Sequence, residues 1–178
     1  GMVRDKLGRK MSKSLGNSPD LLTLIHEYGA DAVRFGIMIS SPAGNDLLFD
    51  ESSLEQGKFF NNKLWNAMKL LKMWDGNKAI SNQQSATGND KFAISWFENR
   101  LNECRNEVDN LMNQFRLSEA LKTIYSLIWD DFCSWYLEWV KPAYGKAMKA
   151  ETLQQTVQFF EQLLQLIHPY MPFITVEI

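Results

Sequence analysis

Residues 54–74 read LEQGKFFNNKLWNAMKLLKMW, and this stretch decides the fold. Its apolar residues recur three and four positions apart, so on a helical wheel they gather into one broad stripe. Lysines and asparagines gather on the other side. This pattern is typical of a helix that packs one side into a core, and we expect it to run from a cap at Asp50 to about Trp74. The residues of the stripe are Gly57, Phe60, Leu64, Ala67, Met68 and Leu71.

Three later segments repeat the same helical spacing. They extend from Trp96 to Phe115, from Leu121 to Trp139 and from Leu153 to Ile167. Pro142 and Pro169 follow the second and third segments, and proline ends a helix because it lacks a backbone N–H. Four long amphipathic helices predict a mainly α protein, organised as an antiparallel helical bundle.

The first 49 residues predict shorter elements ahead of that bundle. We expect a helix over Leu21–Tyr28, with the Ser18 hydroxyl as its cap, Pro19 in its first turn and Gly29 at its end. Residues 30–40 predict a second short helix. A small hairpin at the start would use Met2, Val3 and Leu7.

The chain therefore divides into two parts, residues 1–49 and residues 50–178. Within the second part, residues 75–90 are polar and poor in apolar side chains, so we expect a loop there between two helices of the bundle.

Composition limits the class of protein. Hydrophobic residues make up 45% of the 178 residues, enough for a sizeable core, and a net charge of −2 gives no general attraction for nucleic acid. Cys104 and Cys133 lack the paired spacing of a zinc site or a disulfide scaffold, which fits a reducing cytosol. With no apolar run long enough for a membrane and no signal-peptide pattern, we expect a cytoplasmic protein without a metal site or membrane partner.

The stretch GRKMSKSLGN, residues 8–17, predicts a site for a polyphosphate. Lysine ammonium groups suit phosphate oxygens, serine hydroxyls add donors, and glycines allow a backbone that turns its N–H groups toward an anion. The glycine spacing of a Walker P-loop is missing. Taken without context, such a stretch is more often a solvated basic loop.

The context extends well beyond this loop. KMSKS at residues 10–14 resembles the second signature loop of class I aminoacyl-tRNA synthetases. Further stretches follow in the order expected of the valyl branch: YGADAVRF (28–35), SPAGNDLLFDE (41–51), NKLWNA (62–67), FCSWYLEWVKP (132–142) and HPYMPFIT (168–175). The isoleucyl and leucyl branches share this loop of residues 10–14, called the lysine loop below, and the GAD of residues 29–31. They remain the alternative, but GND followed by NKLWNA favours the valyl branch.

The resemblance implies an enzyme that activates valine with ATP and Mg²⁺ and transfers it to tRNA(Val). Lys10 and Lys13 would be the catalytic residues, with Lys13 stabilising the departing pyrophosphate as negative charge builds on it. The ATP-binding residues implied are Lys10, Met11, Ser12, Lys13 and Ser14.

The family's first signature, a HIGH-type motif, does not occur, since His26 and His168 are the only histidines and neither lies in such a motif. We therefore expect a C-terminal piece of the enzyme, with the end of the catalytic region and the anticodon-binding domain. By itself this piece should be a monomer that binds no cofactor and catalyses no reaction.

The polar side of residues 54–74 is the predicted tRNA-binding face. Lys58, Asn62, Asn66 and Lys69 lie together there, with Leu70 at the border. Lysines would hold phosphates, asparagines would read base edges and apolar side chains would stack on bases. The wheel alone favours an ordinary solvated surface, but the resemblance places anticodon contacts on this bundle.

Other features have simpler interpretations. Trp129, Phe132, Trp135, Tyr136 and Trp139 recur at helical spacing, so we expect core packing and not a cofactor site. Two competing hypotheses for the whole chain are a generic helical interaction module with an incidental lysine loop and a phosphate-binding enzyme unrelated to tRNA.

Overall fold

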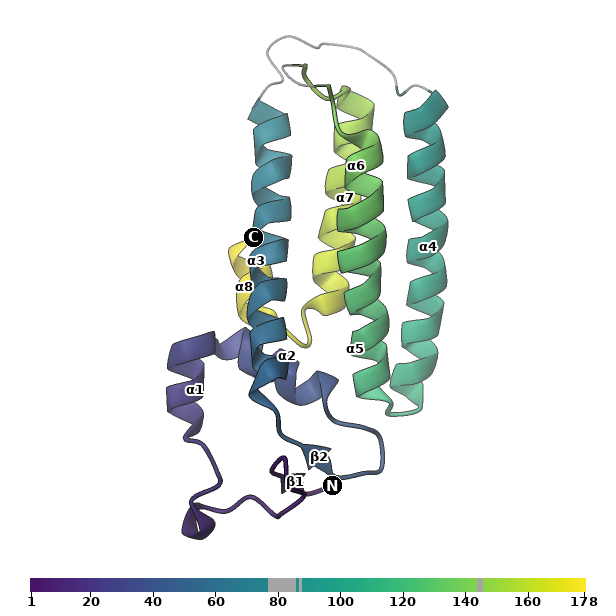
Figure 1. The fold of residues 1–178 in the computed structure, drawn as a ribbon. Coiled ribbons are helices and arrows are strands. Elements are labelled where there is room, and N and C mark those ends of the chain that lie inside the picture. Colours follow the sequence, from purple (N-terminus) through teal and green to yellow (C-terminus); the bar gives the residue numbers. More distant parts are fainter. Residues whose placement is uncertain (77–85, 87, 144–145) are drawn as a thin grey trace.

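The chain forms a long helical bundle with a smaller group of elements at one end (Figure 1). The structure is a computed structural model that describes residues 1–76, 86, 88–143 and 146–178. Most of the loop predicted at residues 75–90 therefore lies outside the described residues. The predicted fold class, a mainly α antiparallel bundle, is confirmed.

Four rods lie side by side in the bundle (Figure 1). The first is α3, Glu51–Gly76, and the second is α4, Gly88–Asn113. The third is continuous and consists of α5, the π-helix η3 and α6, which are Leu117–Ser126, Leu127–Tyr136 and Leu137–Val140. The fourth is α7, Ala150–Ile167.

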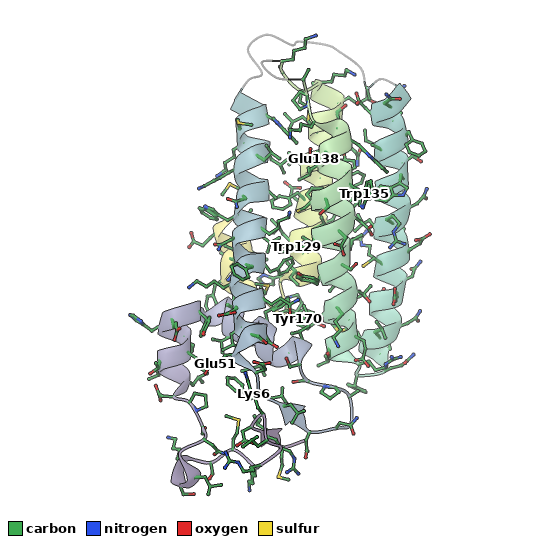
Figure 2. The ribbon with its side chains drawn as sticks, viewed as in Figure 1. Lys6, Glu51, Trp129, Trp135, Glu138 and Tyr170 are labelled. Atoms are coloured by element: carbon green, nitrogen blue, oxygen red, sulfur yellow. The ribbon has the colours of Figure 1, made fainter. Side chains whose placement is uncertain are left out.

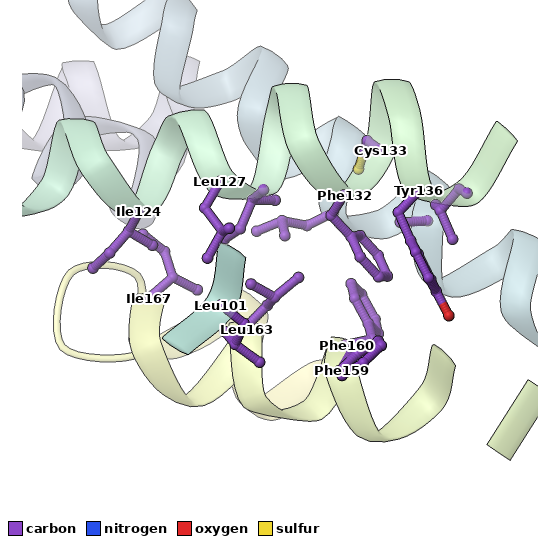
Figure 3. Close-up of a cluster of buried hydrophobic side chains, with 14 of the residues drawn as sticks. Leu101, Ile124, Leu127, Phe132, Cys133, Tyr136, Phe159, Phe160, Leu163 and Ile167 are labelled. Carbon is purple, nitrogen blue, oxygen red and sulfur yellow. The ribbon is translucent and has the colours of Figure 1, made fainter. Parts of the chain in front are cut away.

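One apolar core fills the space between the rods. Every residue of the predicted α3 stripe is buried in it. Its centre is aromatic, because the Phe97 ring of α4 lies 5.2 Å from the Phe132 ring and 5.0 Å from the Phe159 ring. Figure 3 shows this meeting of η3 and α7, where Phe160 stacks on Phe132 at a ring distance of 5.8 Å.

The third rod is where the predicted packing is wrong. Trp135 and Trp139 are 54% and 43% exposed, whereas Phe132 and Tyr136 of the same predicted stripe are fully buried. The reason is the π-helix, in which hydrogen bonds run from residue i+5 to residue i and each turn holds more residues than in an α-helix. The wider turn rotates Trp135 out of the face that an α-helical wheel assigns to it.

The first strands pair differently from the predicted hairpin. β1, Val3–Arg4, pairs in parallel with the distant β2, Leu47–Leu48. A hairpin exists only as a single antiparallel bridge between Arg4 and Lys10. The chain before Lys10 is thus anchored to the segment that leads into α3.

Two short helices follow the lysine loop. α1 spans Leu21–Tyr28 as predicted, but its cap is Asp20, whose Oδ2 accepts from the Thr23 N–H at 3.0 Å. The predicted Ser18 cap is wrong, because Asp20 offers an equally good acceptor one residue from the helix. Gly29, at φ 90°, ends α1 and begins α2, Ala30–Ile39, and this positive φ favours glycine.

α2 and α3 cross at two glycines. A Cβ atom on Gly57 would lie 2.7 Å from the Ala32 carbonyl oxygen, and one on Gly36 would lie 2.8 Å from the Leu54 backbone nitrogen. Both distances are too short for a real Cβ contact. The two helices can pack this closely only because both positions lack a side chain.

The C-terminal helix α8, Pro172–Glu177, is held by α2. The buried Asp31 carboxylate accepts hydrogen bonds from the N–H groups of Phe173 and Ile174 at 3.3 and 2.6 Å. Arg34 donates to the Pro169 and Tyr170 carbonyl oxygens at 2.9 and 3.1 Å. Asp31 and Arg34 of α2 therefore join the first part of the chain to residues 169–174.

The glycine crossing predicts an unusual mutational result. In an open helix, replacing glycine with alanine stabilises by about 1 kcal/mol. At Gly57 the new methyl would meet backbone atoms that cannot move aside, so we expect Gly57→Ala to lower the free energy of unfolding by about 1 to 3 kcal/mol.

The measurement is urea unfolding followed by circular dichroism. The matched control is Gly88→Ala at the start of α4, where an added Cβ meets nothing within 4 Å, and this variant should be as stable as the parent chain or slightly more so. A Gly57→Ala chain with an unchanged unfolding midpoint would contradict the close crossing.

Candidate functional site: the lysine loop and the outer face of α3

The lysine loop folds into a single turn of 3₁₀-helix, η1, over Lys13–Leu15. The Ser12 side chain caps this turn by accepting from the Leu15 N–H at 3.3 Å. Gly16 closes it in the left-handed region, at φ 66°, and donates its N–H to the Lys13 carbonyl oxygen at 3.1 Å. The turn therefore has hydrogen bonds at both ends.

The five predicted ATP-binding residues are presented unequally by this turn. Lys10, Lys13 and Ser14 are exposed, while Met11 and Ser12 are half-buried. The Ser12 and Ser14 hydroxyls are 3.1 Å apart. Two ammonium groups and a pair of hydroxyls thus belong to one short turn, a set of donors suited to phosphate oxygens.

Asn17 holds this turn together, although the sequence analysis did not single it out. Its Oδ1 accepts from the Ser12 N–H at 2.9 Å. Its Nδ2 donates to the Lys10 carbonyl oxygen at 3.2 Å and to Asp5 Oδ2 at 3.0 Å. One amide side chain therefore joins both sides of Met11 to a carboxylate just after β1.

Asp5 is a centre of hydrogen bonds. Besides Asn17, it accepts from the N–H groups of Leu7 and Arg9 at 3.0 and 2.9 Å, and it pairs with the Arg9 guanidinium at 2.8 Å. The hydrogen bond from Asn17, followed by those from Arg9 and the Arg9 charge, lowers the pKa of Asp5 from 3.8 to about 2. Its carboxylate is therefore ionised throughout the physiological range of pH.

The predicted tRNA-binding residues lie on the outer face of α3. Lys58, Asn62, Asn66 and Lys69 are exposed, and Leu70 is half-buried. Lys58 also makes a contact within the chain, because its Nζ donates to the Glu27 carbonyl oxygen at 3.2 Å and lies 5.9 Å from the centre of the Tyr28 ring. It links α3 to the end of α1.

A groove runs between α3 and the η3–α6 rod, and two of the predicted residues, Asn66 and Leu70, line it. Lys63 reaches across it, with its Nζ 4.9 Å from the centre of the Trp129 ring. Figure 2 labels Trp129 and Glu138 on the η3–α6 rod beside α3. The groove thus combines an amide, a cation and a carboxylate from two separate rods, with the Trp129 ring beside it.

Lys63 and Glu138 line the groove although the sequence did not point to them, and Trp129 lies beside it under the Lys63 ammonium. The wheel of residues 54–74 describes one helix, and nothing in it indicates which other helix lies alongside. Trp129 was assigned to the core, but it is only half-buried. FCSWYLEWVKP carries no signal for Trp129, because its tryptophans are Trp135 and Trp139, and the Trp139 ring lies 4.9 Å from the Trp96 ring of α4.

The lysine loop and the outer face of α3 do not form one site. Figure 1 shows the loop at the end of the molecule near β1, while α3 extends to the opposite end of the bundle. α1 and α2 lie between them, and Lys58 is the predicted α3 residue that contacts α1. The chain therefore carries two separate candidate sites.

The two cysteines are poor candidates for a nucleophile, although Cys133 lines the groove. Cys104 and Cys133 are free and buried. Burial raises the pKa of Cys104 to about 12 and that of Cys133 to about 11, so both thiols are protonated at neutral pH and poor nucleophiles. Within the described residues, no group of three His, Cys, Asp or Glu side chains is placed to hold a metal ion.

The two parts of the chain match two family models. Residues 1–50, which include the lysine loop, match the model of class I tRNA synthetases (I, L, M and V). Residues 95–178, which include the η3–α6 side of the groove, match the model of the anticodon-binding domain of tRNA ligase. Together the matches place the chain among the class I tRNA ligases.

Within that class, the chain resembles the valine–tRNA ligases over its whole length, which confirms the predicted branch. It is 55% identical to the valine–tRNA ligase of Porphyromonas gingivalis and 42% identical to that of Bacillus cereus. Each comparison covers 100% of this chain but 20% of the relative. The chain thus spans about a fifth of the length of these relatives.

Solved structures share the fold. A Mycobacterium tuberculosis methionyl-tRNA synthetase in complex with methionyl-adenylate matches 99% of this chain with a TM-score of 0.76 at 23% identity, and the match covers 36% of that protein. An Agrobacterium radiobacter LeuRS in a ternary complex with tRNA and LeuAMS matches 99% of this chain, with a TM-score of 0.70 at 24% identity, over 21% of its own length.

None of the helices in residues 1–76, 88–143 and 146–178 is both long enough and apolar enough to cross a bilayer.

The hydrogen bonds of Asp5 predict a pH dependence of the lysine loop. Since the pKa is lowered by folding, ionised Asp5 stabilises the folded loop fully above about pH 3.8, and this stabilisation is lost as the pH falls through about 2. An NMR titration of the Asp5 carboxyl carbon should give a midpoint near 2 in the parent chain.

Asn17→Ala removes the largest cause of the shift and should move that midpoint toward 3.8. Asn102→Ala, on the exposed side of α4, is the matched control and should leave it unchanged. A midpoint of 3.8 in the parent chain would refute the hydrogen-bonded arrangement.

Proposed function

We propose that this chain is part of a valine–tRNA ligase, an enzyme that activates valine with ATP and transfers it to tRNA(Val). The observation that carries the proposal is the 55% identity over the whole chain, which includes an exposed and hydrogen-bonded lysine loop. Residues 1–49 would serve the chemistry of ATP, and residues 50–178 would bind tRNA. The family matches at 1–50 and 95–178 support this division.

The lysine loop would act on the pyrophosphate. When the carboxylate of valine attacks the α-phosphorus of ATP, the bond to the β-phosphate breaks and negative charge builds on the leaving pyrophosphate. The Lys13 ammonium would neutralise that charge more strongly in the transition state than in bound ATP, with Lys10, Ser12 and Ser14 holding phosphate oxygens. Mg²⁺ would enter with ATP as part of the substrate, where it neutralises phosphate charge.

Apolar side chains in the first part of the chain support its inclusion in a longer protein. Seven apolar side chains from β1, η1, α1 and β2 or their neighbours are exposed: Met2, Val3, Leu7, Leu15, Leu21, Leu22 and Leu48. Side chains of this kind are ordinarily covered when they gather on one surface. We propose that the nucleotide-binding part of the ligase covers them.

The outer face of α3 and the groove beside it would bind the anticodon region of the tRNA. Lys58 and Lys69 would contact phosphates, whereas Asn62 and Asn66 would contact base edges. Leu70 offers apolar surface to an unstacked base. The groove supports this proposal because Asn66 and Leu70 share it with Lys63, so a base and its phosphate would find partners within a short distance.

We place this function in the cytoplasm and in a monomer. Two free, buried cysteines support a reducing compartment.

The role of Lys13 predicts the kinetics of the longer protein. There, Lys13→Ala should lower valine-dependent ATP–pyrophosphate exchange by about a hundredfold, with the KM for valine nearly unchanged, because the ammonium acts on pyrophosphate and not on valine. Lys91→Ala, an exposed lysine of α4, is the control. An unchanged exchange rate for Lys13→Ala would remove this residue from the mechanism.

The chain of 178 residues by itself should show no exchange, because it spans about a fifth of its relatives. Robust valine-dependent exchange by a clean preparation of this chain would contradict the division of labour proposed here.

The tRNA face predicts two kinds of mutational effect. Lys69→Ala should weaken binding to tRNA(Val) and to an anticodon-swapped copy alike and make both less sensitive to salt, because phosphate contacts carry no sequence information. Asn66→Ala should instead reduce the preference for the valine anticodon, because base-edge contacts carry it. Neither change should alter stability by more than about 0.5 kcal/mol, since both side chains are exposed.

The measurement is binding of this chain to both tRNAs across a series of salt concentrations, with thermal melts alongside. Lys122→Ala on α5 is the matched control, and it should have no effect on either tRNA. If Lys69→Ala and Asn66→Ala also bind both tRNAs normally, the outer face of α3 is not the tRNA site, and a general helical interaction module becomes the better interpretation.

A further inference from the structure

Asn17 connects three separate parts of the first segment with one side chain. Its amide oxygen accepts from the backbone of Ser12, and its amide nitrogen donates to the backbone of Lys10 and to the Asp5 carboxylate. Both protons of the nitrogen and one lone pair of the oxygen are therefore used. Asn17 lies outside the five-residue motif and is half-buried, so it would not itself meet a phosphate.

These bonds fix the direction of the chain around the lysines. Holding the Lys10 carbonyl and the Ser12 N–H to one rigid amide defines the backbone on both sides of Met11. Ser12 in turn caps the turn that contains Lys13. The starting points of both lysine side chains are thus set by Asn17, directly for Lys10 and through Ser12 for Lys13.

Asp5 anchors Asn17 to the rest of the fold. Its carboxylate is held by two backbone N–H groups and by Arg9, and it directly follows β1, which pairs with β2. Asn17 therefore connects the loop, through Asp5, to the two-stranded sheet.

Neither alanine nor aspartate can replace this amide. Alanine has no polar group on its side chain, so all three bonds are lost. Aspartate keeps an acceptor for the Ser12 N–H, but it would place a second carboxylate about 3.0 Å from Asp5 and face the Lys10 carbonyl without a proton to donate. Asn17→Asp is therefore nearly identical in shape to the native residue but electrostatically opposed to its partners.

We propose that Asn17, held by Asp5, is a positioning residue that aims Lys10 and Lys13 at the polyphosphate. The inference rests on the proposed function and deepens it. A lysine side chain has four rotatable bonds, so an unfixed backbone lets its ammonium spread over a wide volume. A fixed backbone reduces the ordering that is needed when the pyrophosphate forms, and this ordering is part of the barrier.

The expected kinetic signature separates positioning from general stability. In the longer protein, Asn17→Ala and Asn17→Asp should lower kcat for ATP–pyrophosphate exchange on the order of tenfold to a hundredfold and raise the KM for ATP, because misplaced catalytic groups have effects of that size. The KM for valine and the thermal midpoint should change little. Asn102→Ala on α4 is the control, and its kinetics should match those of the unmodified protein.

Double variants test whether Asn17 acts through the lysines. If it does, Asn17→Ala should have little further effect on exchange in a protein that already carries Lys10→Ala and Lys13→Ala, because the groups it positions are gone. If Asn17→Ala lowers exchange by the same factor in both backgrounds, or lowers kcat only in proportion to the unfolded fraction seen in melts, the positioning role is refuted.

The test also distinguishes this inference from the function on which it rests. An unmodified longer protein without valine-dependent exchange would overturn the proposed function and the positioning role together. An active protein in which Asn17→Ala and Asn17→Asp keep normal kcat and normal KM for ATP would overturn the positioning role alone.

Discussion

The close crossing of α2 and α3 is the constraint on which the rest of the structure depends. Gly36 and Gly57 let the two backbones approach to a distance that any side chain would prevent. α2 belongs to the part of the chain that carries the lysine loop, and α3 is the first rod of the bundle and carries the predicted tRNA face. The crossing therefore decides how the loop is oriented relative to the bundle. It also brings α2 to the position from which Asp31 holds α8 and Arg34 holds the turn before it.

Local patterns predicted the regular parts of this fold and failed where the backbone departs from an ideal α-helix. Every residue of the predicted α3 stripe is buried because α3 is a regular helix with one buried face, although Leu54 and Trp74 are buried too and were not predicted. Trp135 and Trp139 were misplaced because η3 is a π-helix, and the sequence carries no local signal for its longer turn. The cap is Asp20 and not the predicted Ser18, because both residue types accept N–H groups equally well and only the course of the backbone decides between them.

The part of the candidate site formed by consecutive residues, 10–14, could be predicted from the sequence. KMSKS indicates the predicted lysines and serines directly, and it lies within the residues that match the class I tRNA synthetase model. Asn17 and Asp5 could not be found in that way, because their contact depends on a turn that brings residues 12 positions apart together. The groove is harder still, since Lys63 and Trp129 come from different rods. Residue type alone predicted what each side chain can do, but only the tertiary structure shows which side chains can act together.

The bonds from α2 to α8 have a consequence for the order in which this part of the molecule can fold. Asp31 bonds to residues 142 and 143 positions further along the chain. Its buried carboxylate cannot find these partners until the last residues of this segment have been synthesised, whereas α1 and α2 can form as soon as they leave the ribosome. Contacts of such sequence separation are slow to close and follow local helix formation. Until α8 has formed, water solvates the Asp31 carboxylate, and its burial is completed only when α8 packs against α2.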